Sequence, residues 1–212
     1  MEKSTDDAEG GGCQCNALYA ICLVVNLRAF EFFLTLAVLV SASLVRGTLS
    51  TGNTYSINLI DIDGNKHSTA DGHVTIVVLT TSADRERARI VGDHVPDFCL
   101  GNPAYRMITV VHFTGRHMAI GRRMAIGFIR HRVREEAKRL QARYDAQKIS
   151  RDAKSDIFVV SDFAGTVASQ LGQPAGATDF YVFVFGPSGE LLAQWHGVPS
   201  TNELAAAIKK SH

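Results

Sequence analysis

Thiols are the side chains of this sequence best suited to covalent chemistry, and they are unevenly distributed. Cys13, Cys15 and Cys22 lie in the first 46 residues, whereas residues 47–212 hold a single thiol, Cys99. A redox pair or a zinc site needs a different cysteine spacing and further ligands close by, and the pair Cys13 and Cys15 has neither. We therefore interpret the spacing of Cys13 and Cys15 as a chance occurrence.

Cys99 is the candidate for a catalytic thiol, in a loop punctuated by Pro and Gly. Its neighbours are Phe98 and Leu100, with Asp97 one place further, so no adjacent cation lowers the pKa of the thiol. Disulfide chemistry at Cys99 would need a second thiol from an external partner. The alternative is an inert, part-buried cysteine that packs as a small apolar residue.

Histidines offer a weaker hypothesis, a metal site. His112 and His117 are five residues apart at the end of an apolar run. No cysteine pair accompanies them, and two histidines on a loop are poor evidence of a metal site. We therefore predict no metal and no cofactor. His196, in the sequence QWHG, is interpreted as capping the end of the last strand.

A basic segment suggests a binding surface instead of a catalytic site. Residues 116–148 carry ten Lys and Arg against three acidic residues. From Arg122 onward, apolar residues recur at steps of three or four, which predicts one long helix with most arginines outside its apolar stripe. The stripe consists of Ile126, Ile129, Val133, Ala137, Leu140 and Tyr144.

The partner of this basic helix, residues 122–143, would be anionic. The candidate contact residues Arg130, Arg134, Arg139 and Arg143 suit lipid headgroups or an acidic protein. The alternative is a solvated helix face. We predict no nucleic-acid partner, because no set of aromatic side chains for base stacking accompanies the arginines.

Composition limits the class of protein. The 212 residues are 46% apolar and 20% charged, with 22 basic and 21 acidic side chains. These values exclude a disordered chain, a collagen and a disulfide scaffold, and they leave one globular domain, residues 47–212. Residues 1–16 are acidic and Gly-rich and are predicted to be disordered.

Residues 17–46 leave three interpretations open. As a signal peptide, they offer Arg28 ahead of the apolar run 32–40 and small residues before a cleavage point. As an uncleaved anchor, residues 17–45 are long enough for a bilayer of about 30 Å, and Arg28 could pair with Glu31. As the third interpretation, they form a hydrophobic helix of a soluble protein. The first two interpretations predict a body that is exported to the periplasm or membrane-anchored.

The body alternates strands with helices. Residues 56–62 alternate before the turn Asp63-Gly64-Asn65, which predicts a hairpin. Apolar runs at 74–80, 107–113 and 156–161 are typical of strands buried on both faces of a parallel sheet. Three predicted helices follow these runs, from Ser82 or Asp84 to about Val91, from Arg122 onward, and near Thr166–Leu171.

The C-terminal part of the body predicts an antiparallel edge. Residues 180–186 and 190–197 flank Pro187-Ser188-Gly189 as a second hairpin, and Thr201 or Asn202 caps a last helix through Ile208. The predicted fold is therefore α/β, a three-layer sandwich with a central mixed sheet, parallel core strands and a C-terminal antiparallel hairpin.

This order resembles the thioredoxin-like superfamily, closest to its redoxin and peroxiredoxin branch. The resemblance covers nearly all of the body, and it rests on the hairpin motif Leu59–Asn65 ahead of the strand VTIVVLT and on the C-terminal segment FVFGPSGELLAQWHGVPSTNELAAAI. It implies a thioredoxin-like fold and, for an active member, thiol-dependent oxidoreductase or peroxidase activity with an external thiol or thioredoxin as reductant.

The sequence departs from the family at the active site that the resemblance implies. The family places its cysteines where the first buried strand meets its helix, since a helix N-terminus lowers the thiol pKa. Here that junction carries Thr80, Thr81, Ser82 and Asp84 and no cysteine. The family's cis-proline, expected near Asp179 or Phe180, is absent as well.

Three functions follow from these observations. The first is a redoxin-fold protein of the cell envelope with a degraded or residual thiol site. The second is an antioxidant redoxin or peroxidase that uses Cys99. The third is a membrane-associated binding module that uses the basic helix 122–143.

Overall fold

The computed structural model describes residues 48–113, 119–174 and 177–211. Residues 47–212 cluster into one compact unit. The predicted leader, residues 1–16 and 17–46, lies outside the described residues, and so does His117.

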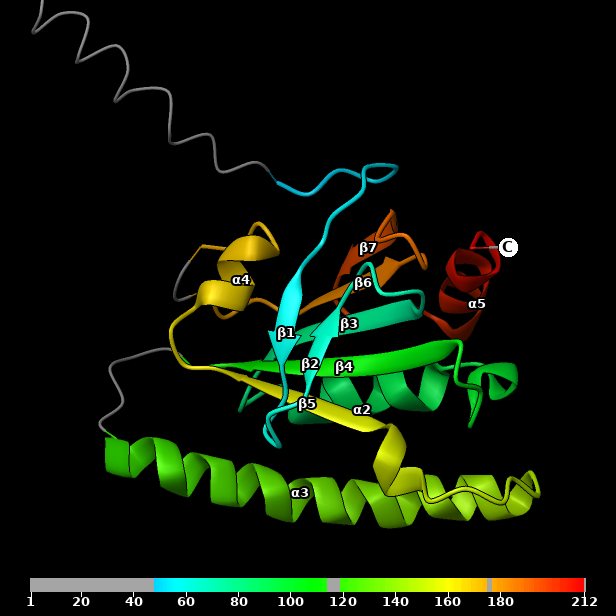
Figure 1. Ribbon diagram of the computed structural model, residues 1–212, viewed down its shortest axis with the longest axis horizontal. Helices are drawn as coiled ribbons and strands as arrows, with labels where there is room; N and C mark the ends of the chain where they lie inside the picture. Colours follow the sequence, from blue (N-terminus) through cyan, green and yellow to red (C-terminus); the bar gives the residue numbers. More distant parts are fainter. Residues whose placement is uncertain (1–47, 114–118, 175–176, 212) are drawn as a thin grey trace, which may run out of the picture. The chain divides into compact units, whose positions relative to one another are not determined.

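A five-stranded mixed sheet with the order β5-β4-β3-β6-β7 forms the middle of the body (Figure 1). Its parallel strands are β3 (Val74–Thr81), β4 (Tyr105–His112) and β5 (Ile157–Asp162). The hairpin of β6 (Tyr181–Phe185) and β7 (Leu191–His196) joins antiparallel to β3. The predicted runs therefore form strands in the predicted directions.

Two layers cover the sheet because its central strands bury both faces. One face carries Val77, Leu79 and Phe183, which pack with β1 (Asn58–Ile60) and α4 (Thr166–Gln170). The opposite face carries Ile76, Val78 and Val182, which pack with α2 (Arg85–His94) and α5 (Thr201–Lys209). The body is the predicted three-layer sandwich, and its fold is thioredoxin-like.

The first hairpin is held together by a carboxylate in its turn. β1 pairs antiparallel with β2 (Lys66–Ser68). Between them, Asp61 accepts hydrogen bonds from the amides of Asp63 and Asn65, from the Asn65 side chain, and from the ring of His67 at 3.0 Å. Burial alone would raise the pKa of Asp61, but these hydrogen bonds together hold it below its ordinary value.

The longest helix, α3 (Ala119–Ala146), lies beyond the β5 edge and contacts the sheet through β5 and through the short 3-10 helix η2 (Ala153–Asp156) (Figure 1). Tyr144 is the anchor, 1% exposed, and its hydroxyl donates to Asp156 at 2.7 Å and accepts the amide of Gly101 at 3.0 Å. Burial and the Asp156 carboxylate raise the pKa of Tyr144 to about 12.

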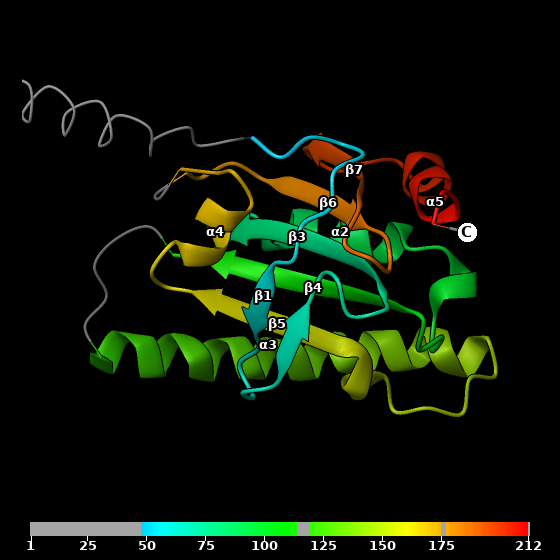
Figure 2. The ribbon, with the colours of Figure 1, turned by 45° about the horizontal axis from the view of Figure 1, so that its top comes forward.

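The chain enters the body at the other edge of the sheet. The amide of Gly52 donates to the carbonyl of Leu191, and the amide of Leu191 donates to the carbonyl of Asn53, both at 2.9 Å. Residues 49–53 therefore lie beside β7, with β3, β4 and β6 between them and the β5 edge where α3 lies (Figure 2).

The N-cap of the last helix lies one residue before the first of the two predicted positions. Ser200, rather than Thr201 or Asn202, is the N-cap of α5: its hydroxyl accepts the Glu203 amide at 3.3 Å, and the Glu203 carboxylate accepts the Ser200 amide at 2.8 Å. This reciprocal pair is a capping box. Three adjacent cap-forming residues, Ser200-Thr201-Asn202, made the position ambiguous, and the glutamate three places after Ser200 resolves it.

We expect Ser200→Ala to lower the free energy of unfolding by about 0.5–2 kcal/mol, because the Glu203 amide in the first turn of α5 loses its hydrogen-bond acceptor. Thr201→Ala is the matched control and should change stability by less than about 0.5 kcal/mol. Urea unfolding followed by circular dichroism checks both. A larger loss in Thr201→Ala than in Ser200→Ala would contradict the assignment of the cap.

We expect Asp61→Asn to destabilise the protein most at neutral pH. The pKa of Asp61 is lower in the folded state, so its stabilisation is present above the ordinary carboxyl pKa and is lost as the pH falls below about 4. Losing the charged acceptor should cost about 1–3 kcal/mol at pH 7. Unfolding at pH 7 and at pH 3 should show a smaller difference from wild type at pH 3, and an equal difference would contradict the assignment.

Candidate functional site

The junction between β3 and α2 is where the resemblance places an active site, and here it is a turn made of hydroxyls and a carboxylate. The Thr81 hydroxyl donates to Asp84 at 3.1 Å and accepts the amide of Ala83 at 3.3 Å. Thr80 is 2% exposed and donates to the carbonyl of Thr81, whereas Ser82 is exposed. The two hydrogen bonds of the Thr81 hydroxyl thus fix the turn that connects β3 to α2.

Asp84 is the N-cap residue of α2, although its side chain makes no capping hydrogen bond. Its carboxylate instead accepts from Thr81 and pairs with the Arg87 guanidinium at 3.3 Å. Arg87 in turn lies over the ring of Phe180, with 4.5 Å between the guanidinium carbon and the ring centroid. The four side chains form one connected cluster, the Thr81–Phe180 cluster: Thr81, Asp84, Arg87 and Phe180.

Phe180 stands at the place where the family's proline was expected. It immediately precedes β6, next to the register pair Leu79 and Tyr181, and it is 1% exposed. Its ring packs in the core between the sheet and α2. The position that would face a thiol is thus filled by an aromatic ring with an arginine against it.

A pair of polar residues lies next to Phe180 along the chain. His196, at the end of β7, is 3.6 Å from the Asp179 carboxylate, and its ring is 4.9 Å from that of Tyr181. Both side chains are more than half exposed. His196 therefore ends β7, as predicted, but pairs with a carboxylate at the surface.

These groups can bind but are poorly suited to thiol chemistry. The Thr81 hydroxyl is committed to the turn, and the Asp84 carboxylate is paired with a cation. Within the described residues, the only cysteine is Cys99. The exposed side chains of Ser82, Asp179 and His196 can offer hydrogen bonds to a ligand, but the junction offers no thiolate.

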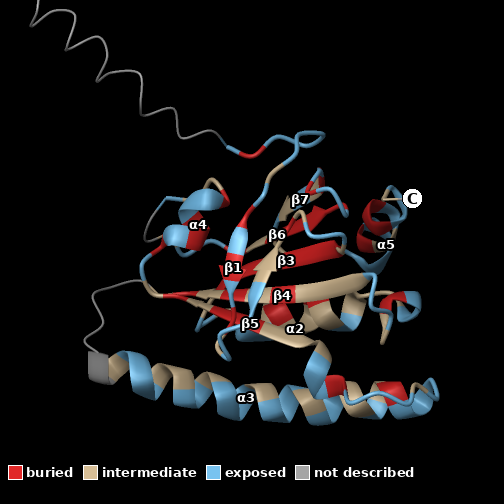
Figure 3. Cartoon of the chain, viewed as in Figure 1, coloured by how far each residue is buried: buried red, intermediate tan, exposed pale blue. Residues whose placement is uncertain are grey.

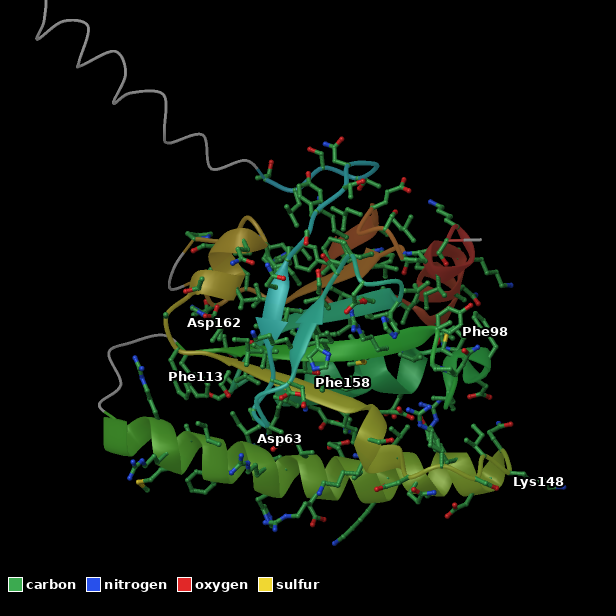
Figure 4. All side chains as sticks on the ribbon, viewed as in Figure 1. Asp63, Phe98, Phe113, Lys148, Phe158 and Asp162 are labelled. Atoms are coloured by element: carbon green, nitrogen blue, oxygen red, sulfur yellow. The ribbon has the colours of Figure 1, made fainter. Side chains whose placement is uncertain are left out.

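Cys99 lies at the opposite end of the sheet. It ends the short 3-10 helix η1 (Asp97–Cys99), which precedes the amino end of β4, and it belongs to the same core cluster as Val74 at the start of β3. The eight residues of β3 separate that end from Thr81, about 23 Å at 3.3 Å per residue. In Figure 4, Phe98 and Asp162 mark the two ends.

The Cys99 thiol is shielded from solvent. Cys99 is 6% exposed, and burial raises its pKa from 9.0 to about 12. The thiol is therefore protonated at neutral pH, and the proton must be removed before it can act as a nucleophile. Its burial comes from residues distant in sequence, such as Val74 and Val182, which a position in a loop punctuated by Pro and Gly does not reveal.

The predicted arginine surface divides into two parts. Arg143 donates to the carbonyls of Gly92 and Val95 and pairs with Asp97 at 3.0 Å, so it binds the C-terminal end of α2. Arg130 donates to the carbonyl of Ile62 at 3.0 Å and lies 3.4 Å from the Asp63 carboxylate. Arg134 and Arg139 are exposed. The structure thus uses Arg130 and Arg143 in tertiary contacts and leaves the other two at the surface.

Arg87 and its contact with Phe180 were not predicted. Arg87 lies three places after Asp84, which is the spacing of an ion pair on one helix. That signal was available in the sequence. The contact with Phe180 joins residues 93 places apart, and only the fold brings them together.

His112 lies at the carboxyl end of β4, opposite Thr81 on one side and Asp162 on the other. Its Nδ1 is 3.5 Å from the Asp162 carboxylate, and both side chains are buried. The Asp162 carboxylate also accepts a hydrogen bond from the amide of Ala168 in α4 at 2.9 Å. His112 therefore belongs to the packing beneath α4. Among the described residues, no group of three or more His, Cys, Asp or Glu could hold a metal ion.

Among the comparisons with known proteins, the one with solved structures finds similar chains. No protein-family model matches the chain, and no curated protein matches it. The exposed lipoprotein thioredoxin of Streptococcus pneumoniae is 14% identical, with 74% of this chain and 99% of that one covered and a TM-score of 0.47. A peroxiredoxin-like protein from Aquifex aeolicus is 14% identical, with 78% and 90% covered and a TM-score of 0.45. A putative electron transfer protein from Aquifex aeolicus is 19% identical, with 77% and 95% covered and a TM-score of 0.46.

The topology itself defines the class. Three parallel strands ordered β5-β4-β3 continue into an antiparallel hairpin, and α2 follows the central strand. The chain therefore has the thioredoxin-like fold that the sequence predicted. Within the described residues, no helix is long and apolar enough to span a membrane.

We expect Cys99 to resist alkylation in the folded protein. The rise of the Cys99 pKa from 9.0 to about 12 leaves roughly a thousandfold less thiolate at neutral pH than an exposed cysteine would have. The measurement is iodoacetamide labelling, followed by mass spectrometry, of a chain in which Cys13, Cys15 and Cys22 are replaced by Ser. The control is the same chain in urea, where labelling should proceed at the rate of a free cysteine. Equal rates in both states would contradict the burial of the thiol.

Proposed function

We propose that this chain is a redoxin-fold protein of the cell envelope that has lost thiol redox chemistry and works by binding. The observation that carries the proposal is the Thr81–Phe180 cluster. Thiol chemistry needs a helix N-terminus and the segment that faces it. The cluster occupies both of these places.

The first half is occupied by Asp84 and its partners. A thiolate at a helix N-terminus is stabilised by the positive end of the helix dipole. Here Asp84 supplies the negative charge at that end, and Arg87 neutralises it. The negative charge is thus a carboxylate, which neither forms a disulfide nor reduces a peroxide.

The second half is occupied by Phe180. A substrate disulfide must approach the helix N-terminus closely for a thiolate to attack a sulfur atom. The buried Phe180 ring, with Arg87 stacked on it, lies beside this place. The nearby side chains of Asp179 and His196 remain exposed and can take part in recognition.

Cys99 does not replace the missing thiol. It is buried and lies at the far end of β3 from the junction, and its raised pKa keeps it protonated. The proposed location in the envelope rests on the apolar residues 17–45, which suit export or anchoring.

The test is turnover of hydrogen peroxide and of a model disulfide by the full-length chain, with dithiothreitol and with thioredoxin as reductants. We expect no rate above background, and the same result for Cys99→Ser, because the junction has no thiol and Cys99 is protonated. A second variant, with Cys13, Cys15 and Cys22 replaced by Ser, controls for thiols of the leader.

A rate that Cys99→Ser abolishes would overturn the proposal and establish a redoxin that works with one cysteine. A rate lost only in the leader variant would overturn it as well, because redox chemistry would then reside outside the fold. Unfolding curves of each variant show whether a lost rate reflects a lost thiol or a lost structure.

A further inference from the structure

Helix α3 is apolar on two opposite sides near its N-terminal end. Ile126 and Ile129 belong to the stripe that faces the body, and both are half-buried. Met124 and Phe128, one turn apart on the opposite side, are 61% and 68% exposed. They are the two most exposed large apolar side chains of the described residues.

This pattern differs from that of an ordinary surface helix. Such a helix turns one apolar stripe to the core and polar side chains to solvent. The C-terminal part of α3 follows the rule, since Tyr144 is buried and the opposite side carries Lys138 and Arg139, both exposed (Figure 3). The N-terminal part breaks it, because its outward side carries a methionine and a phenylalanine where polar residues are expected.

Positive charge surrounds the exposed pair. Between Gly121 and Arg139 the helix carries seven basic residues and two acidic ones, a net charge of +5 with histidine neutral. Arg123 and Arg132 are exposed on either side of Phe128 along the helix. An anionic partner is favoured by this charge, whereas a second copy of the same helix would bring two surfaces of +5 together.

The shape of the surface favours a bilayer over a folded protein. A stable protein interface buries about 800 Å² on each partner around an apolar core. Here the apolar part is two side chains on a convex helix that lies beyond the sheet edge (Figure 1). A lipid surface can deform around such a helix, accept its apolar side chains between headgroups and bind its arginines through phosphate groups.

We propose that the N-terminal half of α3 binds the surface of an anionic lipid bilayer. Met124 and Phe128 insert between the lipid headgroups. Arg123 and Arg132 bind lipid phosphates, together with the exposed Arg134 and Arg139. This inference is independent of the loss of thiol chemistry, because it concerns another edge of the fold.

The test reports the environment of position 128 itself, so that binding through the apolar leader cannot imitate the result. Phe128→Cys is labelled with the polarity-sensitive dye nitrobenzoxadiazole in the full-length chain, with Cys13, Cys15 and Cys22 replaced by Ser. The same label at Asn202→Cys, exposed in α5, is the matched control. The vesicles are phosphatidylcholine alone or phosphatidylcholine with 30% phosphatidylglycerol.

We expect the dye at position 128, but not at 202, to shift its emission to shorter wavelength on anionic vesicles and to lose the shift in 0.5 M NaCl. Arg123→Gln with Arg132→Gln should weaken this binding about 30-fold, because each arginine near the surface contributes about fivefold. Lys209→Gln with Lys210→Gln makes the same charge change at the C-terminal end of α5 and should leave the binding unchanged.

Three results would overturn the proposal. The first is no shift at position 128, and the second is an equal shift on neutral vesicles. The third is a shift produced by polyglutamate as strongly as by anionic lipid, which would indicate an acidic protein as the partner. Circular dichroism of each labelled chain confirms that the compared proteins are folded.

Discussion

The burial of both faces of β3 is the constraint on which the rest of the structure depends. Seven of its eight residues are buried, and the strand pairs with β4 on one side and β6 on the other. A strand with two apolar faces must be covered by a layer on each side. The hairpin β1–β2 with α4 supplies one layer and α2 with α5 the other, so that the junction at Thr80 and Thr81 is fixed at the end of a rigid strand.

Elements that depend on local patterns could be predicted, and contacts between distant segments could not. The three apolar runs predicted parallel strands because a buried parallel strand needs nothing but a continuous β-branched run. The hairpins were readable from their turn residues, such as Gly189, whose φ of +85° and close approach to the carbonyl of Tyr55 leave no room for a side chain. The roles of Arg143 and Phe180 depend on residues 46 to 93 places away in sequence, and no local signal marks them.

The candidate site shows the same division. The absence of cysteine at the junction was plain from the sequence, as was the set of small polar residues that stands there. The sequence did not show that Asp84, Arg87 and Phe180 would form one connected cluster, because this depends on α2 and β6 meeting beside the same strand. Cys99 is the converse case: its neighbours in sequence indicated nothing about the residues that bury it.

The pairing of β3 with β6 also determines when the body can fold. Leu79 pairs with Tyr181, roughly a hundred residues later, and residues 49–53 are held by β7 at the end of the chain. The middle of the sheet therefore cannot close until nearly the whole chain has been synthesised, and non-local pairing of this kind is slow. An N-terminal segment such as residues 17–45 would leave the ribosome long before the body is compact. The topology thus leaves the chain without a closed sheet for most of its synthesis.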